Sequence, residues 1–353
     1  MARKKKYTAA VIGTGRIGFT LGFDRKREQP ASHTMALRAN RRIKLIAGCD
    51  NNGPRLAHWH RFNRKAAVYS DCSYLFATSK PDIVVVSVNE KWHLETALTA
   101  IRAKPALVIL EKPVALNVEE GRRIQAEAAL CNVPVLVNHE RRFADDYRLV
   151  RSYMLKIGEI LTVNARLDSG LYVYNPEKEA DGEYSLLHDG THLVDIVSYL
   201  LEDRAASTPE NASVLKNMKI TSIEYDKEKS EVVRNLNVHF ESDECHDINI
   251  FMSGKSKYFG FEVEVIGTTG RLKIGNGIAE FYQREESKLY TGFYSLAEDK
   301  SVKLPKKTKY FANMVKNAVD FLDGKAPLRS TLQTGLNTLQ VLEDIKNSIK
   351  SSL

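Results

Sequence analysis

Cysteine is scarce in this chain, and no apolar run is long. The 353 residues include four cysteines, Cys49, Cys72, Cys131 and Cys245, without a C-x-x-C pair. Scattered cysteines are typical of small core residues in a reducing compartment, and they exclude a disulfide framework or a cysteine-based metal site. No apolar stretch approaches the roughly 20 residues that span a bilayer, and the basic N-terminus runs directly into a predicted strand. We therefore predict a cytoplasmic protein with neither a membrane partner nor a bound metal.

The excess of positive charge is small outside the N-terminal tail. Lys and Arg total 52 against 44 acidic residues, a formal net charge of +8, and four of the basic residues lie in segment 3–6. Nucleic-acid sites usually show basic patches interleaved with aromatic residues, and the sequence has no such pattern elsewhere. We therefore expect no nucleic-acid partner, whereas anionic small molecules remain candidate substrates.

The first part of the chain alternates between apolar strands and helical patterns. Nearly continuous apolar strands of this kind are expected in a parallel sheet that is covered on both faces. A chain of this length also exceeds one ordinary core. We predict a doubly wound Rossmann-type domain over 1–140 and a second domain over 141–353. The predicted strands are 7–12, 43–48, 83–88, 107–110 and 133–137, with helices at 94–102 and 119–129.

A glycine-rich turn, G-T-G-R-I-G at 13–18, follows the first strand. In a dinucleotide-binding turn the first glycine permits the tight bend, the second lets a pyrophosphate approach the backbone, and the third allows close packing. We expect a helix to open here. The candidate cofactor contacts of this loop are Gly13, Gly15, Arg16, Ile17 and Gly18.

Asp50 ends the second predicted strand, where a carboxylate can accept hydrogen bonds from ribose hydroxyls. This position favours NAD over NADP. A capping role in the next turn stays open, and the nearby Arg55 keeps NADP as the alternative. The charged segment 22–30 lengthens the interval before Asp50 and includes Pro30, so we expect a loop there, either near the cofactor phosphates or simply solvated, with the helix resuming at His33.

The tripeptide Glu111-Lys112-Pro113 follows the strand 107–110. Strands of a doubly wound sheet present their carboxyl ends along one edge, where such folds bind ligands. A lysine beside a nicotinamide at that edge is a candidate acid/base group. We therefore assign Lys112 to catalysis and to both cofactor and substrate binding, and Glu111 to the cofactor.

The second half changes to strands with alternating polarity, which predicts an antiparallel or mixed sheet. A polar connection is expected at 202–212. The predicted strands are 160–165, 220–225, 232–240, 247–252 and 259–266, with helices at 142–155, 186–201, 311–322 and 331–349.

The helix 186–201 carries a second chemical cluster, L-H-D-G-T-H at 187–192. His188 and His192 are four residues apart, so they share one helix face, and either imidazole can take an alcohol proton near neutral pH. Two other interpretations are a structural role for both histidines and a weak variant of the H-E-x-x-H zinc helix, in which Asp189 replaces the required glutamate.

Together, the glycine turn, the strand-end aspartate, E-K-P, Arg142-Phe143 and H-D-G-T-H resemble the glucose-fructose oxidoreductase/inositol dehydrogenase/MocA (Gfo/Idh/MocA) family over nearly the whole chain. The resemblance implies an α/β protein with an N-terminal Rossmann domain and a C-terminal α+β domain with an open-faced, mostly antiparallel sheet. It implies hydride exchange between NAD(P) and a secondary alcohol of a sugar or cyclitol. Lys112 and His192 match the acid/base positions, whereas His188 replaces the family's usual aspartate.

The resemblance also implies further site residues. Asn89 and His93 would line the nicotinamide ribose, with a strand-end cap and a helix-start histidine as the alternatives, and Pro113 would follow a cis peptide. The implied substrate contacts are Lys112, Arg142, Tyr172, His188, Asp189 and His192. Arg141 or Arg142 would meet an anionic group, and the alternative for either is an ion pair with Asp145 or Asp146. Tyr172 and the nearby Tyr174 would contact substrate from a loop, and their alternative is an exposed position on a strand edge.

The family's open sheet face often joins subunits, and alternating strands would leave an apolar face to cover, so we expect a homodimer or homotetramer. Two other functions remain open: a non-catalytic dinucleotide-binding sensor, and an NAD-recycling, redox-neutral lyase or glycosidase.

Overall fold

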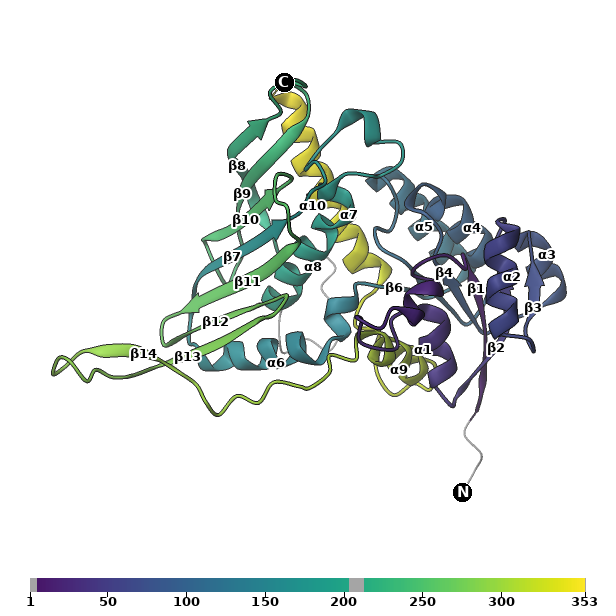
Figure 1. Cartoon of the computed structure of the whole chain (residues 1–353), viewed down its shortest axis with the longest axis horizontal. Helices are drawn as coiled ribbons and strands as arrows, with labels where there is room; N and C mark the ends of the chain where they lie inside the picture. The colour runs from purple at the N-terminus through teal and green to yellow at the C-terminus, as the bar shows by residue number, and fades with distance from the viewer. Residues whose placement is uncertain (1–4, 203–212, 353) are drawn as a thin grey trace. The chain divides into compact units, whose positions relative to one another are not determined.

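The computed structural model describes residues 5–202 and 213–352 (Figure 1), so most of the predicted polar connection 202–212 lies outside the described residues. These residues form two compact units. The first comprises the chain up to Ala144 together with 307–339, and the second comprises the described residues of 145–306 and 340–353. Within the described residues, no helix is long and apolar enough to cross a membrane.

The first unit is built on a six-stranded parallel sheet in the order β3-β2-β1-β4-β5-β6. Its interior strands β4 and β5 are buried along their whole length, as the continuous apolar sequences predicted. The doubly wound arrangement is therefore confirmed. The strands are β1 (Tyr7–Ile12), β2 (Ile43–Cys49), β3 (Ala67–Tyr69), β4 (Ile83–Val86), β5 (Leu107–Leu110) and β6 (Val135–Val137).

Helices cover this sheet, and one of them comes from the far end of the sequence. Helix α9 (Tyr310–Leu322) lies beside α1 (His33–Ala39), and its Phe311 and Met314 belong to the same buried cluster as Val85 of β4 (Figure 1). This apolar packing explains why 307–339 groups with the first unit. The other helices are α2 (Gly53–Phe62), α3 (Cys72–Thr78), α4 (His93–Arg102) and α5 (Val118–Cys131).

The helix expected directly after the glycine turn does not form. A turn and a short 3-10 helix, η1 (Thr20–Phe23), take its place, and a loop then leads to α1. Pro30 cannot donate a backbone hydrogen bond, so no helix continues through it. Ser32 instead caps a new helix by accepting from Met35 N, which is why α1 begins at His33, as predicted.

The second unit contains an eight-stranded sheet in the order β14-β13-β12-β11-β7-β10-β9-β8. All neighbouring strands are antiparallel except β7 and β10, which confirms the mostly antiparallel sheet. The strands are β7 (Ile160–Asp168), β8 (Lys216–Tyr225), β9 (Val233–Glu241), β10 (Ile248–Ser253), β11 (Gly260–Gly267), β12 (Gly270–Gly275), β13 (Ile278–Glu286) and β14 (Tyr294–Glu298).

Helices α6 (Asp145–Tyr153), α7 (Ser185–His188) and α8 (Gly190–Leu201) lie on one side of this sheet (Figure 1). The last helix, α10 (Leu332–Ser351), has residues in both units. The strand β7 alternates accordingly, with Val163 and Ala165 buried toward the helices and Asn164 and Arg166 on the open face.

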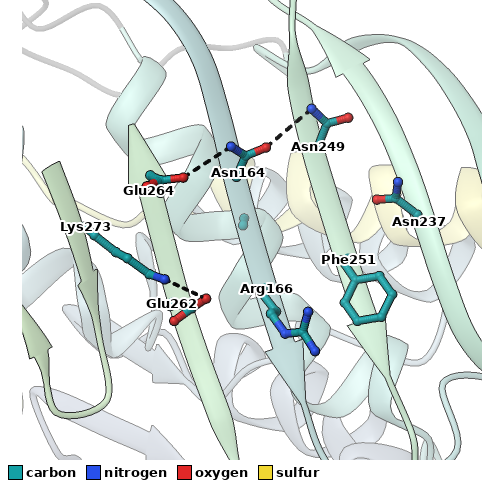
Figure 2. Close-up of a pocket in the computed structure, with 9 residues that line it drawn as sticks. Asn164, Arg166, Asn237, Asn249, Phe251, Glu262, Glu264 and Lys273 are labelled. Carbon is teal, nitrogen blue, oxygen red and sulfur yellow. Dashed lines mark hydrogen bonds and ion pairs between the residues drawn. The ribbon is translucent and has the colours of Figure 1, made fainter. Parts of the chain in front are cut away.

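The open face of the sheet is polar, which corrects the expectation of an apolar face. A depression of about 350 Å³ lies on this face, and Figure 2 shows the polar side chains that line it. Lys273 pairs there with Glu262 at 3.0 Å, and Asn164 donates to Glu264 at 3.4 Å. The guanidinium of Arg166 lies over the ring of Phe251, 4.6 Å from its centroid. The side chains that alternate onto the open face are therefore mostly charged or polar and pair with one another, whereas apolar side chains were expected there.

Candidate active site

The glycine turn packs tightly against the end of β4. Gly13 has φ +87°, and a Cβ there would lie 2.4 Å from the carbonyl oxygen of Ser87. The Ser87 hydroxyl donates to the Gly13 oxygen at 2.9 Å. A Cβ on Gly18 would lie 2.0 Å from that same Gly13 oxygen, so Gly18 closes the loop on itself. The protein's own packing therefore requires both glycines, and Ser87 is a loop-supporting residue that no motif predicted.

Gly15 differs from these two glycines. Among the described residues, apart from Gly15 and its two chain neighbours, a Cβ there would have one atom within 4 Å, Nη1 of Arg55 at 3.8 Å. The backbone at Gly15 is therefore open in the way that an approaching phosphate requires. Arg16 is exposed, whereas Ile17 packs against the core of the first unit.

Asp50 links the end of β2 to the glycine turn. Its Oδ2 accepts from Thr14 N at 2.7 Å and from Thr14 Oγ1 at 3.0 Å, and its Oδ1 accepts from Asn52 N at 2.9 Å. The capping alternative is therefore present in the structure. Thr14 lies within the glycine motif, but the motif gives its side chain no role, so this contact was missed.

Glu111 is an internal anchor, with 5% of its surface exposed. Nε2 of His33 lies 2.6 Å from its Oε1, and Asn138 Nδ2 donates to the same oxygen at 2.6 Å. Burial alone would raise the pKa of Glu111, but the hydrogen bond and charge of His33, together with the Asn138 amide, outweigh it and hold the pKa below its usual value. Neither His33 nor Asn138 was predicted as a site residue, because their contacts are non-local.

Lys112 is half-buried and directly follows this anchor. The Lys112-Pro113 peptide is cis, as predicted. On the other side, Nδ1 of His93 lies 2.6 Å from the Pro113 oxygen, and its Nε2 lies 3.2 Å from the Val88 oxygen. Both neighbours of Lys112 are thus held by buried polar contacts, which fixes the backbone that carries its side chain.

Two further candidates follow β4. His93 begins α4 and is 1% exposed, so its position matches the helix-start alternative. Asn89 is exposed, and its backbone oxygen rather than its side chain accepts from Trp92 N at 2.9 Å. The Asn89 side chain therefore makes no capping hydrogen bond.

In the second unit, the predicted helix 186–201 is divided at Asp189. Helix α7 ends at His188, and α8 begins at Gly190, where a Cβ would lie 3.0 Å from Cε of Met252 on β10. Gly190 thus allows the helix to approach the sheet closely. His188, Asp189 and His192 are all half-buried around this break, and no metal-binding group of three or more His, Cys, Asp or Glu side chains exists in the described part of the chain.

The remaining substrate candidates differ in exposure. Arg142 lies in the 3-10 helix η3 (Glu140–Phe143) and is 1% exposed. Tyr172 is half-buried beneath the Arg234 guanidinium, which lies 4.7 Å from its ring centroid. Tyr174 is fully buried, and its hydroxyl donates to Glu179 at 3.1 Å. It is therefore neither an exposed residue on a strand edge nor a loop residue that faces a substrate.

Family models match both parts of the chain. Residues 7–139 match the oxidoreductase family with an NAD-binding Rossmann fold, and residues 154–352 match its C-terminal alpha/beta domain. The protein therefore belongs to the Gfo/Idh/MocA oxidoreductase family.

Curated relatives match over shorter segments. The chain is 29% identical over 169 residues to the D-glucoside 3-dehydrogenase of Escherichia coli, covering 45% of this chain and 47% of that protein. It is 28% identical over 205 residues to the 1,5-anhydro-D-fructose reductase of Ensifer adhaerens, covering 56% and 57%. These matches thus span about half the length of the curated relatives.

Solved structures have a similar fold over nearly the whole chain. One is the WlbA dehydrogenase of Bordetella pertussis in complex with NADH and UDP-GlcNAcA, which superposes with a TM-score of 0.72. The two sequences are 17% identical, and the superposition covers 99% of this chain and 98% of the other. At this identity the likeness concerns the fold alone.

Proposed function

We propose that this protein is an NAD(P)-dependent dehydrogenase that oxidises a secondary alcohol of a sugar, sugar derivative or cyclitol. The observation that carries the proposal is Lys112, held at the carboxyl edge of a Rossmann sheet between two anchored neighbours. The sugar-directed names of the two curated relatives support the substrate class. The four free thiols support a cytoplasmic location.

The residues of the first unit fit a dinucleotide. The open backbone at Gly15, with Gly13 and Gly18 shaping the turn, would hold the pyrophosphate, and Asp50 would accept from a ribose hydroxyl. When bound, the nicotinamide supplies the acceptor for a hydride from the carbinol carbon. NAD is the proposed cofactor. Arg55, next to Gly15, is the residue that would favour NADP instead.

Lys112 and His192 are the proposed acid/base groups. His192 would take the hydroxyl proton, and Lys112 would donate a hydrogen bond to the same oxygen and stabilise the charge that develops on it. His188 would orient His192 or bind a neighbouring hydroxyl. We assign further substrate contacts to Asp189, Arg142 and Tyr172, and further cofactor contacts to Asn89 and His93, with Glu111 acting from its buried position.

The experiment is a survey of NADH formation from NAD, and of NADPH formation from NADP, across sugars, sugar phosphates, nucleotide sugars and inositols. The Lys112→Ala variant should lose about 10²–10⁴-fold in turnover while binding NAD with nearly unchanged affinity. The exposed Lys80 of the same unit provides the control variant Lys80→Ala, which should keep full turnover. Turnover that survives in Lys112→Ala would remove this lysine from catalysis.

The two other functions give distinct results. A sensor would bind NAD without turnover of any compound and would capture a protein partner in an NAD-dependent way. A redox-neutral lyase or glycosidase would form product without net NADH. We further propose a homodimer or homotetramer, which light scattering at several protein concentrations tests.

A further inference from the structure

Two of the four cysteines lie in direct contact. Cys49 is the last residue of β2, Cys72 is the first residue of α3, and their Sγ atoms are 3.5 Å apart. A disulfide joins sulfurs at about 2.05 Å, so a small rotation or shift separates this contact from a bond. The other two cysteines are isolated from this pair: Cys131 lies against Glu127 on α5, and Cys245 against backbone carbonyls in the second unit.

The two thiols have different surroundings. Cys49 is 2% exposed, whereas Cys72 is half-exposed and therefore accessible to a small oxidant. A hydrogen bond from the Cys49 thiol lowers the pKa of Cys72, against burial and the nearby carboxylates Asp71 and Asp50. The same contact, together with burial, raises the pKa of Cys49. Cys72 is thus the better nucleophile, and Cys49 is the thiol that holds the proton.

We propose that Cys72 and Cys49 form a peroxide-reactive dithiol site, with Cys72 oxidised first and Cys49 as the resolving thiol. The Cys72 thiolate attacks hydrogen peroxide, so that an S–O bond forms, the O–O bond breaks and hydroxide leaves, taking up a proton as water. The Cys49 sulfur then attacks the Cys72 sulfur, so that the S–S bond forms, the S–O bond breaks and a second water leaves. The two thiols lose two electrons and two protons to the peroxide, and two equivalents of a small-molecule thiol reduce the disulfide back to the two thiols while forming their own disulfide.

The location of the pair gives the oxidation a consequence. The Cys49 carbonyl accepts from Gly13 N at 2.8 Å, and the next residue, Asp50, accepts from Thr14. These hydrogen bonds connect Cys49 and Asp50 to Gly13 and Thr14, the first two residues of the glycine turn. A disulfide at Cys49 therefore shifts the turn, and dinucleotide affinity falls, a consequence that rests on the proposed function.

The first experiment is independent of any activity. The full-length protein is treated with hydrogen peroxide, the remaining thiols are alkylated with N-ethylmaleimide in denaturant so that buried thiols also react, and the digest is read by mass spectrometry. We expect the Cys49 and Cys72 peptides to be joined, with loss of two hydrogens, while Cys131 and Cys245 remain alkylated. Alkylation of Cys49 and Cys72 that equals that of Cys131 after peroxide would overturn the proposal.

Variants separate the two roles. In Cys49→Ser the reaction should stop at a Cys72 sulfenic acid that dimedone traps, whereas in Cys72→Ser neither the disulfide nor the adduct should form. Cys131→Ser is the matched control and should oxidise like wild type. Dimedone labelling of Cys49 in Cys72→Ser, to the level of Cys72 in Cys49→Ser, would remove the assigned order.

NAD titration of the reduced and oxidised proteins tests the consequence. We expect oxidation to raise the Kd for NAD by about tenfold, equivalent to about 1.4 kcal/mol, and a reducing thiol to restore it. An unchanged Kd in protein shown to carry the disulfide would overturn the link to the glycine turn. Failure of the reduced protein to bind NAD would instead count against the proposed function, and the peptide result would still decide the dithiol site.

Discussion

His33 and Glu111 form a buried hydrogen-bonded pair across 78 residues of sequence, with 2.6 Å between Nε2 and Oε1. Their side chains are 0% and 7% exposed. The pair fastens the first residue of α1 to the end of β5, and the ring of Phe311 from α9 meets the His33 ring edge-on, with 5.0 Å between centroids. Three elements that are distant in sequence are thus joined immediately beside Lys112.

Removing one partner of this pair should be costly. We expect His33→Ala to lower the free energy of unfolding by about 1–3 kcal/mol, because the variant leaves the buried Glu111 carboxylate without one of its hydrogen bonds. Denaturant unfolding measures the loss. The exposed His246 of the second unit provides the control His246→Ala, which should change stability by less than about 0.5 kcal/mol. A His33→Ala variant as stable as this control would mean that the pair does not stabilise the unit.

Alanine substitutions at Gly15 and Gly18 should distinguish a glycine needed for cofactor binding from one needed for folding. Gly15→Ala should leave the free energy of unfolding nearly unchanged and weaken NAD binding, because its side faces open space. Gly18→Ala should destabilise the protein by several kcal/mol, since its Cβ would overlap the Gly13 carbonyl oxygen at 2.0 Å. Thermal unfolding and NAD titration of both variants provide the comparison. Equal loss of stability in both would contradict the assignment of Gly15 to the ligand side.

Asp50 should matter to the apoprotein as well as to the cofactor. Asp50→Ala leaves the buried Thr14 N–H and hydroxyl without their acceptor, which should cost about 1–3 kcal/mol of stability without any dinucleotide present. If the carboxylate also accepts from ribose, the variant should in addition lose preference for NAD over NADP. Unfolding of the apoprotein reports the first effect, and competitive titration of the two dinucleotides reports the second. A change in preference without any loss of stability would show that the Thr14 contacts contribute little.

Glu179 should give the second unit a distinct acid sensitivity. Burial alone would raise the pKa of Glu179, but hydrogen bonds and charges from Lys350 and Lys346 outweigh it and lower the pKa to about 2. A pKa lowered by folding contributes stability above the unfolded value of 4.5, and that contribution is lost as pH falls toward 2. The stability difference between wild type and Glu179→Gln should therefore be constant above about pH 5 and shrink below it.

Urea unfolding at a series of pH values measures this difference. Glu183→Gln is the control, because its ion pair with Lys178 is exposed and such pairs contribute little. A difference between wild type and Glu179→Gln that grows as pH falls would contradict the lowered pKa.

The sequence predicted the elements whose local pattern agrees with their final environment. The strands β1 and β5 were predicted to the residue, because both are buried on two faces and read as continuous apolar runs. Strands β12, β13 and β14 were not predicted. Half-buried and exposed residues along β13 and β14 dilute the alternation on which strand prediction depends, whereas β12 alternates regularly and was missed although its pattern is present.

The candidate site was predictable only in its motifs. G-T-G-R-I-G and E-K-P mark the carboxyl edge of the sheet, but the side chains that hold them come from elsewhere in the chain. Ser87, His33 and Asn138 support these motifs through contacts that span 27 to 78 residues. The contact between Cys49 and Cys72 is non-local in the same way. No spacing rule describes such pairs, since the fold and not the local sequence brings them together.

The return of α9 to the first unit determines where this chain can be cut. A fragment that ends near residue 140 would lack Phe311, Met314 and Val315, and would expose the faces of Leu37, Val85 and their neighbours that these residues cover. Such a fragment should aggregate, although the family match for the Rossmann fold ends at residue 139. A first unit that folds alone would instead need its two segments, the chain up to Ala144 and 307–339, joined by a new linker. The end of the family match at residue 139 is therefore not a position at which the folded protein can be divided.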